Sequence, residues 1–362
     1  MPSQDVVVQS AIQSIFEKIN PVSSKQNFWL IRTDTGAMYD EFLSTSSVGI
    51  SHSEFYPPEL LRLGRAFRDS DGSFVIPEIK KQLKSLLKSK YKHRYDEVTK
   101  HYGIGSAEYN SLEYTINLTA SQIVRFVFEM KEGDIVVIPS YRSEYAAIGL
   151  VRETALSDRR AGAFILRKDV KWEKTLERVD LDANFHSVFK AHQAINNITP
   201  YRDIILRTLY DFYIDSGNAN LVLNVATQGR INAMEFYEFG YSFLKLCDQF
   251  FLEYNLPYRA SDIDLILNLN SPGKIKFFSA AKVSLVAVSV LYVLTIGGGG
   301  EVSLGNMNLK VQTDGLLKAW TDFQNESQRR EIVDKVLENS DSLEIKRPED
   351  FIKILDQLDT KK

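Results

Sequence analysis

The sequence predicts an α+β protein in two parts: a small β-barrel with flanking helices, then a β-α-β-β module with a hydrophobic helix and C-terminal helices. Short apolar runs separated by turn residues predict the barrel, and a long helical pattern between strand-like runs predicts the module. The length of 362 residues is more than one core usually holds. We expect these divisions: an amphipathic helix over 1–20, the barrel domain over 25–200, a linker helix over 201–217, the α/β module over 218–278, and the hydrophobic and C-terminal helices over 279–362.

The first segment, residues 1–20, has apolar residues at helical spacing, so we expect it to pack on a domain or on a sister chain. It lacks the basic and continuous apolar regions of a secretory signal. The single cysteine, Cys247, fits a reducing compartment and excludes an internal disulfide. We therefore expect a cytoplasmic protein.

The barrel domain begins with two predicted strands, FWLIR and SSVGIS, which flank the short turn or helix of YDEF. Residues 57–77 contain several Pro and Gly residues, which predicts a loop. Thr119 with Gln122 has the spacing of a capping box, which predicts that a helix begins there.

The run GDIVVIPSYRSEYAAIGLVRE, residues 133–153, is typical of a hairpin with a polar turn at Ser140, Tyr141 and Ser143. A further strand, AFILRKDVKWEKTL, follows it. We expect the segment from Asp182 to Ile198 to close the domain as a helix, and a further helix to begin near Pro200.

A basic helix is predicted from Lys80 to Lys100, where eight Lys and Arg residues accompany two acidic residues, Asp96 and Glu97, with Tyr91, His93 and Tyr95 among them. A solvated helix face explains such a run as well as nucleic-acid binding does. Because phosphates attract cations while aromatic faces accept bases, we assign phosphate contacts to Lys84, Lys88 and Arg94.

The second half changes character after Gly217. ANLVLNVAT, DIDLILNL and SPGKIKFF are predicted strands, and a long helix separates the first two. VSLVAVSVLYVLTI is fourteen residues without a charge, whereas a spanning helix needs about 20. A buried helix or an oligomer interface is favoured, and membrane contact stays open.

The sequence shows no recognisable catalytic constellation, and whether the protein is an enzyme stays open. The five histidines form no HExxH motif, and we expect neither a metal nor a cofactor. Two acidic triplets have the composition, but not the strand context, of a metal-dependent nuclease: they are Asp71, Glu78 and Lys80, and Asp341, Glu344 and Lys346.

The order FWLIR, YDEF, VGIS, ASQIVRFVFEM, KEGDIVVIPS, AAIGLV and VKWEKTL resembles the EVE-like branch of the PUA superfamily, in the form fused to methylation-dependent restriction endonucleases. The resemblance covers roughly residues 25–200. It implies a small β-barrel whose pocket accepts a flipped, often modified, base. The second half is loosely similar to an accessory module of bacterial conflict-system proteins.

The resemblance also implies the residues of a base pocket. Aromatic walls would come from the early aromatic segment and the hairpin turn, and polar groups would meet the base edge. The implied residues are Trp29, Tyr39, Phe42, Ser121, Gln122, Ser140 and Tyr141. The chain departs from the family at Ile50, Ser51 and His52, where a Gly-Trp pair is common, and at Ser121, where a glycine is.

Together these observations predict a nucleic-acid sensor that binds a flipped modified base, with DNA favoured over RNA, in bacterial anti-phage defence. We expect a homo-oligomer, joined through the second half or signalling through it to a separate effector protein. Two alternatives stay open: a divergent nuclease of modified DNA, and a membrane-acting effector.

Overall fold

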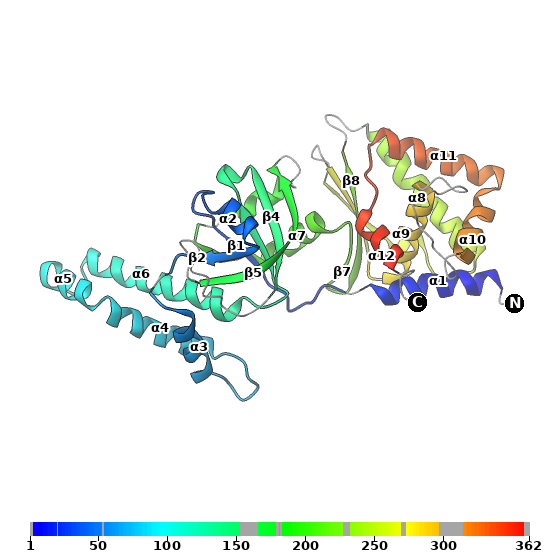
Figure 1. Ribbon diagram of the computed structural model, residues 1–362. Coiled ribbons are helices and arrows are strands. Elements are labelled where there is room, and N and C mark those ends of the chain that lie inside the picture. Colours follow the sequence, from blue (N-terminus) through cyan, green and yellow to red (C-terminus); the bar gives the residue numbers. More distant parts are fainter. Residues whose placement is uncertain are drawn as a thin grey trace. The chain divides into compact units, whose positions relative to one another are not determined.

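The computed structural model describes residues 3–19, 21–52, 54–152, 166–178, 181, 183–190, 192–226, 232–268, 273–296 and 314–357. The chain forms two compact units (Figure 1). We call Gln26–Arg202 the central unit, and Met1–Lys25 together with Asp203–Lys362 the terminal unit. The first helix therefore packs with the C-terminal half of the chain. Residues 201–217 are not a separate linker helix, because most of them belong to the terminal unit.

The described strands of the central unit form one six-stranded sheet in the order β2-β5-β4-β3-β1-β6. The pair β1 and β3 is parallel, and the other pairs are antiparallel. The strands are β1 (Phe28–Ile31), β2 (Ser47–Ile50), β3 (Ile135–Pro139), β4 (Tyr145–Val151), β5 (Leu166–Glu177) and β6 (Ile195–Asn197).

The sheet curls into a half-barrel and is open, which corrects the expectation of a closed barrel. Its edges are β2 and β6, strands of four and three residues. Both β1 and β3 are buried along their whole length, because they lie in the middle of the sheet and carry apolar side chains on both faces. This double burial explains why the sequence predicts these strands well.

Four helices lie between β2 and β3, in a segment for which the sequence predicts a loop and one basic helix. They are α3 (Pro57–Ala66), α4 (Ile76–Lys90), α5 (Lys92–Tyr102) and α6 (Ala107–Val124), and a π-helical turn (Arg125–Glu129) follows α6. We call α4, α5 and α6 the arm (Figure 1). The apolar residues Ile79, Leu83 and Leu87 of α4 are buried in the same core as the sheet.

Three expectations about local structure are corrected in part in this region and beside it. Residues 57–66 are helical because Pro57 begins the first turn, where its missing N–H costs nothing, and Glu59 accepts from the Tyr56 N–H at 2.8 Å. Helix α6 begins at Ala107, where the Ser106 Oγ accepts from the Tyr109 N–H at 3.1 Å, so the Thr119 spacing lies inside the helix. The predicted closing helix is a 3₁₀ segment, Ala183–Lys190, followed by β6.

The terminal unit contains an antiparallel sheet in the order β7-β8-β10-β9. Its strands are β7 (Phe212–Asp215), β8 (Asn218–Val225), β9 (Asp264–Asn268) and β10 (Gly273–Ser279). Its helices are α1 (Gln4–Lys18), α7 (Arg202–Leu209, from Asp203 on), α8 (Ala233–Glu253), α9 (Lys282–Ile296), α10 (Asp314–Gln324), α11 (Ser327–Ser342) and α12 (Glu349–Gln357). The strand β7 was not predicted, because its sequence continues a helical pattern.

The hydrophobic helix α9 lies in the core of the terminal unit. Every residue from Ser284 to Thr295 is buried, and the Tyr292 ring meets those of Phe239 and Phe243 on α8 edge to face. The favoured interpretation, a buried helix, therefore describes its position. Across the described residues, we find no helix that combines the length and the apolar content needed to cross a membrane.

Candidate ligand cavity of the central unit

A cavity of about 630 Å³ opens where the curled sheet brings β2 near the ends of β1 and β3. Its walls come from β2, the loop after β1, the turn between β3 and β4, and the segment before β6. The residues around it are Arg32, Thr33, Asp34, Thr35, Gly36, Gly49, Ile50, Ser51, Pro139, Ser140, Tyr141, Arg142, Ser143, His192 and Ala194.

Two tight loops shape the cavity, and both contain left-handed backbone. Asp34, Thr35 and Gly36 have φ angles of 49°, 53° and 98°, and Arg142 and Ser143 have φ angles of 50° and 55°. Such angles are uncommon outside glycine and often accompany functional sites. Five of them around one cavity indicate loops that the surrounding structure holds in place.

The two loops touch each other at Gly36. A Cβ atom at this position would lie 2.3 Å from the Tyr141 backbone nitrogen, so only glycine fits. The Thr33 hydroxyl donates to the Pro139 carbonyl at 2.5 Å and joins the same loops a second time. The contact fixes where the Tyr141 ring leaves the backbone.

Three of the six hydroxyl groups around the cavity form hydrogen bonds within the protein. Thr33 donates to Pro139, Thr35 donates to the Asp34 carbonyl at 2.7 Å, and the Ser140 Oγ accepts from the Tyr145 N–H at 2.8 Å. These bonds hold the loops. The hydroxyls of Ser51, Tyr141 and Ser143 have no hydrogen-bond partner among the described residues and can meet a ligand.

The charged groups around the cavity are mainly basic. Arg32 is partly buried, whereas Arg142 and His192 are exposed, and Asp34 is the acidic residue among those that line it. The Arg142 guanidinium lies 5.1 Å from the centre of the Tyr141 ring, a cation–π contact. Tyr141 itself is 55% exposed, so its ring is free to meet a ligand. The cavity thus offers cations, an aromatic face and hydrogen-bond donors.

Two of the predicted pocket residues, Ser140 and Tyr141, line this cavity. Trp29 does not: it is 1% exposed, and its Nε1 donates to the buried Asp134 carboxylate at 2.8 Å. It borders another cavity of about 510 Å³, beside Asp71 and Phe74. The structure therefore does not bring Trp29 and Tyr141 together.

The remaining aromatic candidates are also core residues. Phe42 is fully buried, and Tyr39 is buried in the same cluster, where burial raises the pKa of its hydroxyl while Thr175 opposes that shift. Trp29, Tyr39 and Phe42 lie on a short strand and a short helix near the start of the domain, and their rings fill the core of the half-barrel. We therefore remove them from the base pocket.

The polar candidates on α6 lie outside the cavity as well. The Ser121 hydroxyl donates to the Asn117 carbonyl at 2.7 Å within the helix. Gln122 is buried, and its Oε1 lies 2.7 Å from the Nε2 of His52. Both side chains have structural partners and do not line the cavity.

Two cavity residues were missed by the sequence analysis, Arg32 and His192. Arg32 follows the buried strand β1 directly, and a charge at the end of an apolar strand is the signal that identifies it in retrospect. His192 has no such signal, because its place depends on β6 pairing with β1.

The predicted phosphate-binding residues lie on the arm and differ in their surroundings. The Lys88 Nζ is 2.6 Å from Glu113, which also accepts from the Tyr95 hydroxyl at 3.0 Å. The bond from Lys88 lowers the pKa of the Glu113 carboxyl, and Tyr95 adds to this effect. Lys84 is partly buried and Arg94 is exposed. Lys88 therefore already has a counter-ion.

The acidic triplets are not arranged as a nuclease site. Asp71 is in a loop, where the Ser73 N–H donates to it at 2.8 Å and lowers its pKa. Glu344 and Lys346 follow α11, where their backbones pair with the end of β8. In the part of the chain that the structure describes, no three His, Cys, Asp or Glu residues are grouped so that they could hold a metal ion.

Comparison with known proteins gives one match. A family model described as a domain of unknown function, DUF8426, matches residues 87–198. The matched segment runs from the end of α4 to the end of β6 and includes the turn at Tyr141, but it omits β1, β2 and Arg32. No curated protein and no solved structure matches the chain.

Proposed function

We propose that the central unit binds a nucleic acid and receives one unstacked base in the cavity beside Tyr141. The observation that carries this proposal is an exposed tyrosine ring on the rim of a cavity of about 630 Å³ whose basic residues are Arg32, Arg142 and His192. A nucleotide needs an aromatic face, donors for its base edge and cations for its phosphates. The cavity supplies each of these.

The size of the cavity suits this ligand. Small-molecule sites usually measure 300–1,000 Å³, a range that includes the cavity at about 630 Å³. A base in a duplex reaches such a cavity only if it is flipped, at a cost of a few kcal/mol that is smallest for modified or mismatched bases. We therefore keep a flipped, modified base in DNA as the favoured ligand, and a relation to EVE-like domains as part of the proposal.

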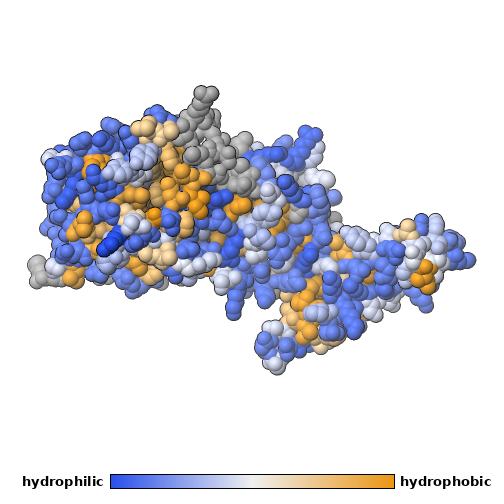
Figure 2. Space-filling view, turned by 180° about the vertical axis from the view of Figure 1, so that it is seen from behind, coloured by the Kyte–Doolittle hydropathy of each residue, from blue (hydrophilic) through white to orange (hydrophobic). Residues whose placement is uncertain are grey.

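The arm would supply contacts to the phosphate backbone. Its exposed cations include Lys81, Lys92 and Arg94, and Figure 2 shows the arm, at the right of that view, as a mostly hydrophilic surface. Backbone contacts of this kind add affinity but no sequence preference. The base in the cavity would then determine selectivity.

For the terminal unit we propose self-association or signalling to a separate effector. On α8 the residues Met234, Tyr237 and Tyr241 are exposed along one side, and the two tyrosine rings stack at 6.2 Å. Exposed aromatic residues on a helix surface are typical of interaction sites. This supports an interface on the terminal unit.

Binding to short DNA duplexes tests the base-binding proposal. The duplexes carry one unmodified, methylated or hydroxymethylated cytosine, and a single-stranded RNA is compared with them. We expect Tyr141→Ala to weaken binding by about fivefold or more, because base–aromatic stacking contributes about 1–3 kcal/mol. Tyr114→Ala is the matched control, since Tyr114 is 64% exposed, against 55% for Tyr141, but lies on the arm outside the cavity. Wild-type affinity in Tyr141→Ala would reject the cavity as the site.

A further inference from the structure

Among the arginines that the structure describes in the central unit, Arg32 is the one that is partly buried and has no protein partner for its side chain. The described arginines of this unit that are not exposed are Arg32, Arg125, Arg167 and Arg202. Three of them are hydrogen-bonded: Arg125 to Gln193 and Ile195, Arg167 to Ser47 and Glu41, and Arg202 to Gln26. No acceptor within the described ranges receives a bond from the Arg32 guanidinium, although its backbone N–H donates to Ala194 at 2.9 Å.

A partly buried guanidinium loses water contacts that a partner must replace. Arginine carries five N–H donors in a planar fork and has no acceptor. The partner must therefore be a group with acceptors, and the fork favours two acceptors side by side in one plane. The lining of the cavity provides no such group, because Asp34 is exposed and forms no ion pair with Arg32.

Several other polar side chains of the cavity either bond within the protein or are more exposed than Arg32. The hydroxyls of Thr33, Thr35 and Ser140 are committed to the two loops, as described above. Arg142 and His192 are exposed and lie nearer to solvent than Arg32. Arg32 is thus the group that meets the inner edge of a bound base.

We propose that Arg32 selects bases that present two adjacent acceptors on the edge that faces the major groove in a duplex, and this inference rests on the proposed function. On that edge guanine presents such a pair as O6 and N7, whereas adenine and cytosine carry an amino donor there. A carboxylate attached to a pyrimidine presents the same planar pair. The shared chemistry is a fork of two acceptors, and the two sources are separated by experiment.

The experiment measures the affinity of the full chain for single-stranded oligothymidines with one central test base. The test bases are guanine, 7-deazaguanine, 5-carboxycytosine, cytosine and adenine. We expect at least tenfold tighter binding of guanine or of 5-carboxycytosine than of cytosine and adenine. Loss of the preference with 7-deazaguanine identifies guanine as the source, and preference for 5-carboxycytosine identifies the carboxylate.

Arg32→Lys tests the role of the fork, because it keeps the charge and removes the paired donors. We expect it to bind all five oligonucleotides with similar affinity. Arg142→Lys is the matched control, since it changes a rim cation and should weaken all five to the same extent. The Arg32 side chain has no partner in the described structure, so thermal unfolding of Arg32→Lys should match that of wild type.

Two results would overturn the inference. One is equal affinity of the wild type for all five bases, and the other is an unchanged preference in Arg32→Lys. If Tyr141→Ala still weakens binding in either case, base binding in the cavity stands and only the role of Arg32 fails. If Tyr141→Ala has no effect, the proposed function itself fails.

Discussion

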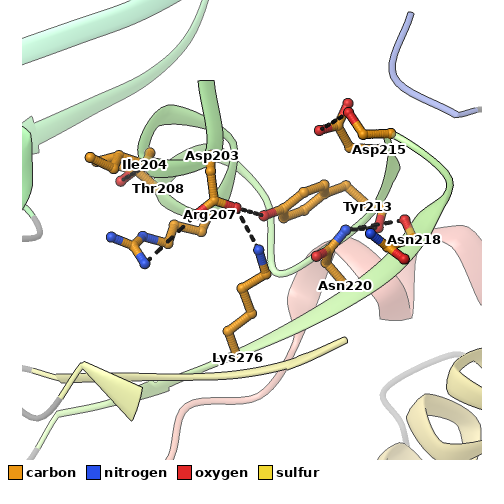
Figure 3. A network of polar contacts seen from close by, with 10 residues as sticks. Asp203, Ile204, Arg207, Thr208, Tyr213, Asp215, Asn218, Asn220 and Lys276 are labelled. Carbon is orange, nitrogen blue, oxygen red and sulfur yellow. Dashed lines mark hydrogen bonds and ion pairs between the residues drawn. The ribbon is translucent and has the colours of Figure 1, made fainter. Parts of the chain in front are cut away.

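Two polar regions of the molecule contain arginine near a sheet, but they satisfy their charges differently. In the terminal unit, Asp203 Oδ1 accepts from the Lys276 ammonium at 2.5 Å and from the Tyr213 hydroxyl at 3.4 Å (Figure 3). The Arg207 guanidinium lies 3.8 Å from Asp203 Oδ2. Lys276 is 7% exposed, and Arg207 and Tyr213 are also buried. In the cavity of the central unit, the Arg32 guanidinium has no such partner within the described residues.

The difference separates a structural cluster from a binding site. Buried charges that are paired inside the protein hold elements together, here α7 with β7 and β10. Burial, with the nearby Asp203 charge, raises the pKa of Tyr213, so its hydroxyl stays protonated as a donor. A charge without an internal partner leaves its donors for a ligand. We therefore expect substitutions in the first region to change stability and those in the second to change binding.

The largest expected effect tests the structural side of this comparison. Asp203→Ala removes the counter-ion of Lys276 and should lower the free energy of unfolding by about 2–3 kcal/mol, at the low end for buried pairs because Asp203 is itself half exposed. Urea unfolding followed by circular dichroism measures it. Glu331→Gln is the control, because both side chains of its pair with Lys335 are exposed, at 72% and 54%, so the pair should contribute less than about 0.5 kcal/mol. Full stability of Asp203→Ala would show that the network is not structural.

Gly36→Ala tests whether the two cavity loops depend on each other. The added Cβ meets the Tyr141 backbone nitrogen at 2.3 Å and the backbone has a φ of 98°, so we expect about 2 kcal/mol lower stability and a loss of base binding. Gly103→Ala has similar backbone strain, at a φ of 84°, but open space around the new atom. It should cost about 1 kcal/mol and leave binding intact. Equal DNA affinity of Gly36→Ala and Gly103→Ala would show that base binding beside Tyr141 does not depend on the contact between the two loops.

Lys168 is a third kind of buried ionisable residue, and its contribution to stability depends on pH. It is fully buried, its Nζ donates to the Met130 carbonyl at 2.5 Å, and burial lowers its pKa to about 7. Between pH 7 and 10 the unfolded chain binds more protons, so this residue should make stability rise by about 1 kcal/mol per pH unit. Lys168→Met should lose that slope in urea unfolding between pH 7 and 9, while the exposed Lys171→Met should keep it.

The smallest expected effect concerns the arm, where Lys88 is paired and Lys92 has no partner among the described residues. Lys92→Gln should weaken DNA binding about twofold and lower the slope of log affinity against log salt by about 1. Lys88→Gln should lower that slope by less, because Glu113 already replaces its counter-ions. Titration at several salt concentrations measures both. Equal slopes in the two variants would mean that pairing on the arm has no influence.

The sequence predicts the continuous apolar elements of this fold well and its boundaries less well. The strands β1 and β3 were predicted because each is buried along its whole length and therefore apolar, and the strand β8 and the helix α9 were predicted because their buried parts are mostly apolar. The helix α3 was taken for a loop, because proline also begins helices. The order of the strands in the open sheet and the packing of α1 in the terminal unit depend on contacts between residues far apart in the chain, which local patterns do not contain.

The candidate site was also predicted only in part, because some of its residues carry a local sequence signal and others do not. Ser140 and Tyr141 stand out because a polar turn interrupts two apolar strands, and both line the cavity. The aromatic residues near the start of the domain carry no local sign that separates a pocket wall from the core. His192 reaches the cavity only through the pairing of β1 with β6, which a single sequence does not reveal, whereas Arg32 was missed although it follows an apolar strand directly.

The helix α1 packs against α9, α10 and α12, which follow it only after the whole central unit. During synthesis its apolar side, with Val8, Ile12 and Ile15, leaves the ribosome long before these partners exist. The central unit is continuous and can fold in that interval as an independent body. Until then the apolar side of α1 has no partner in the chain. We therefore expect nascent chains truncated before α9 to bind holding chaperones through this helix.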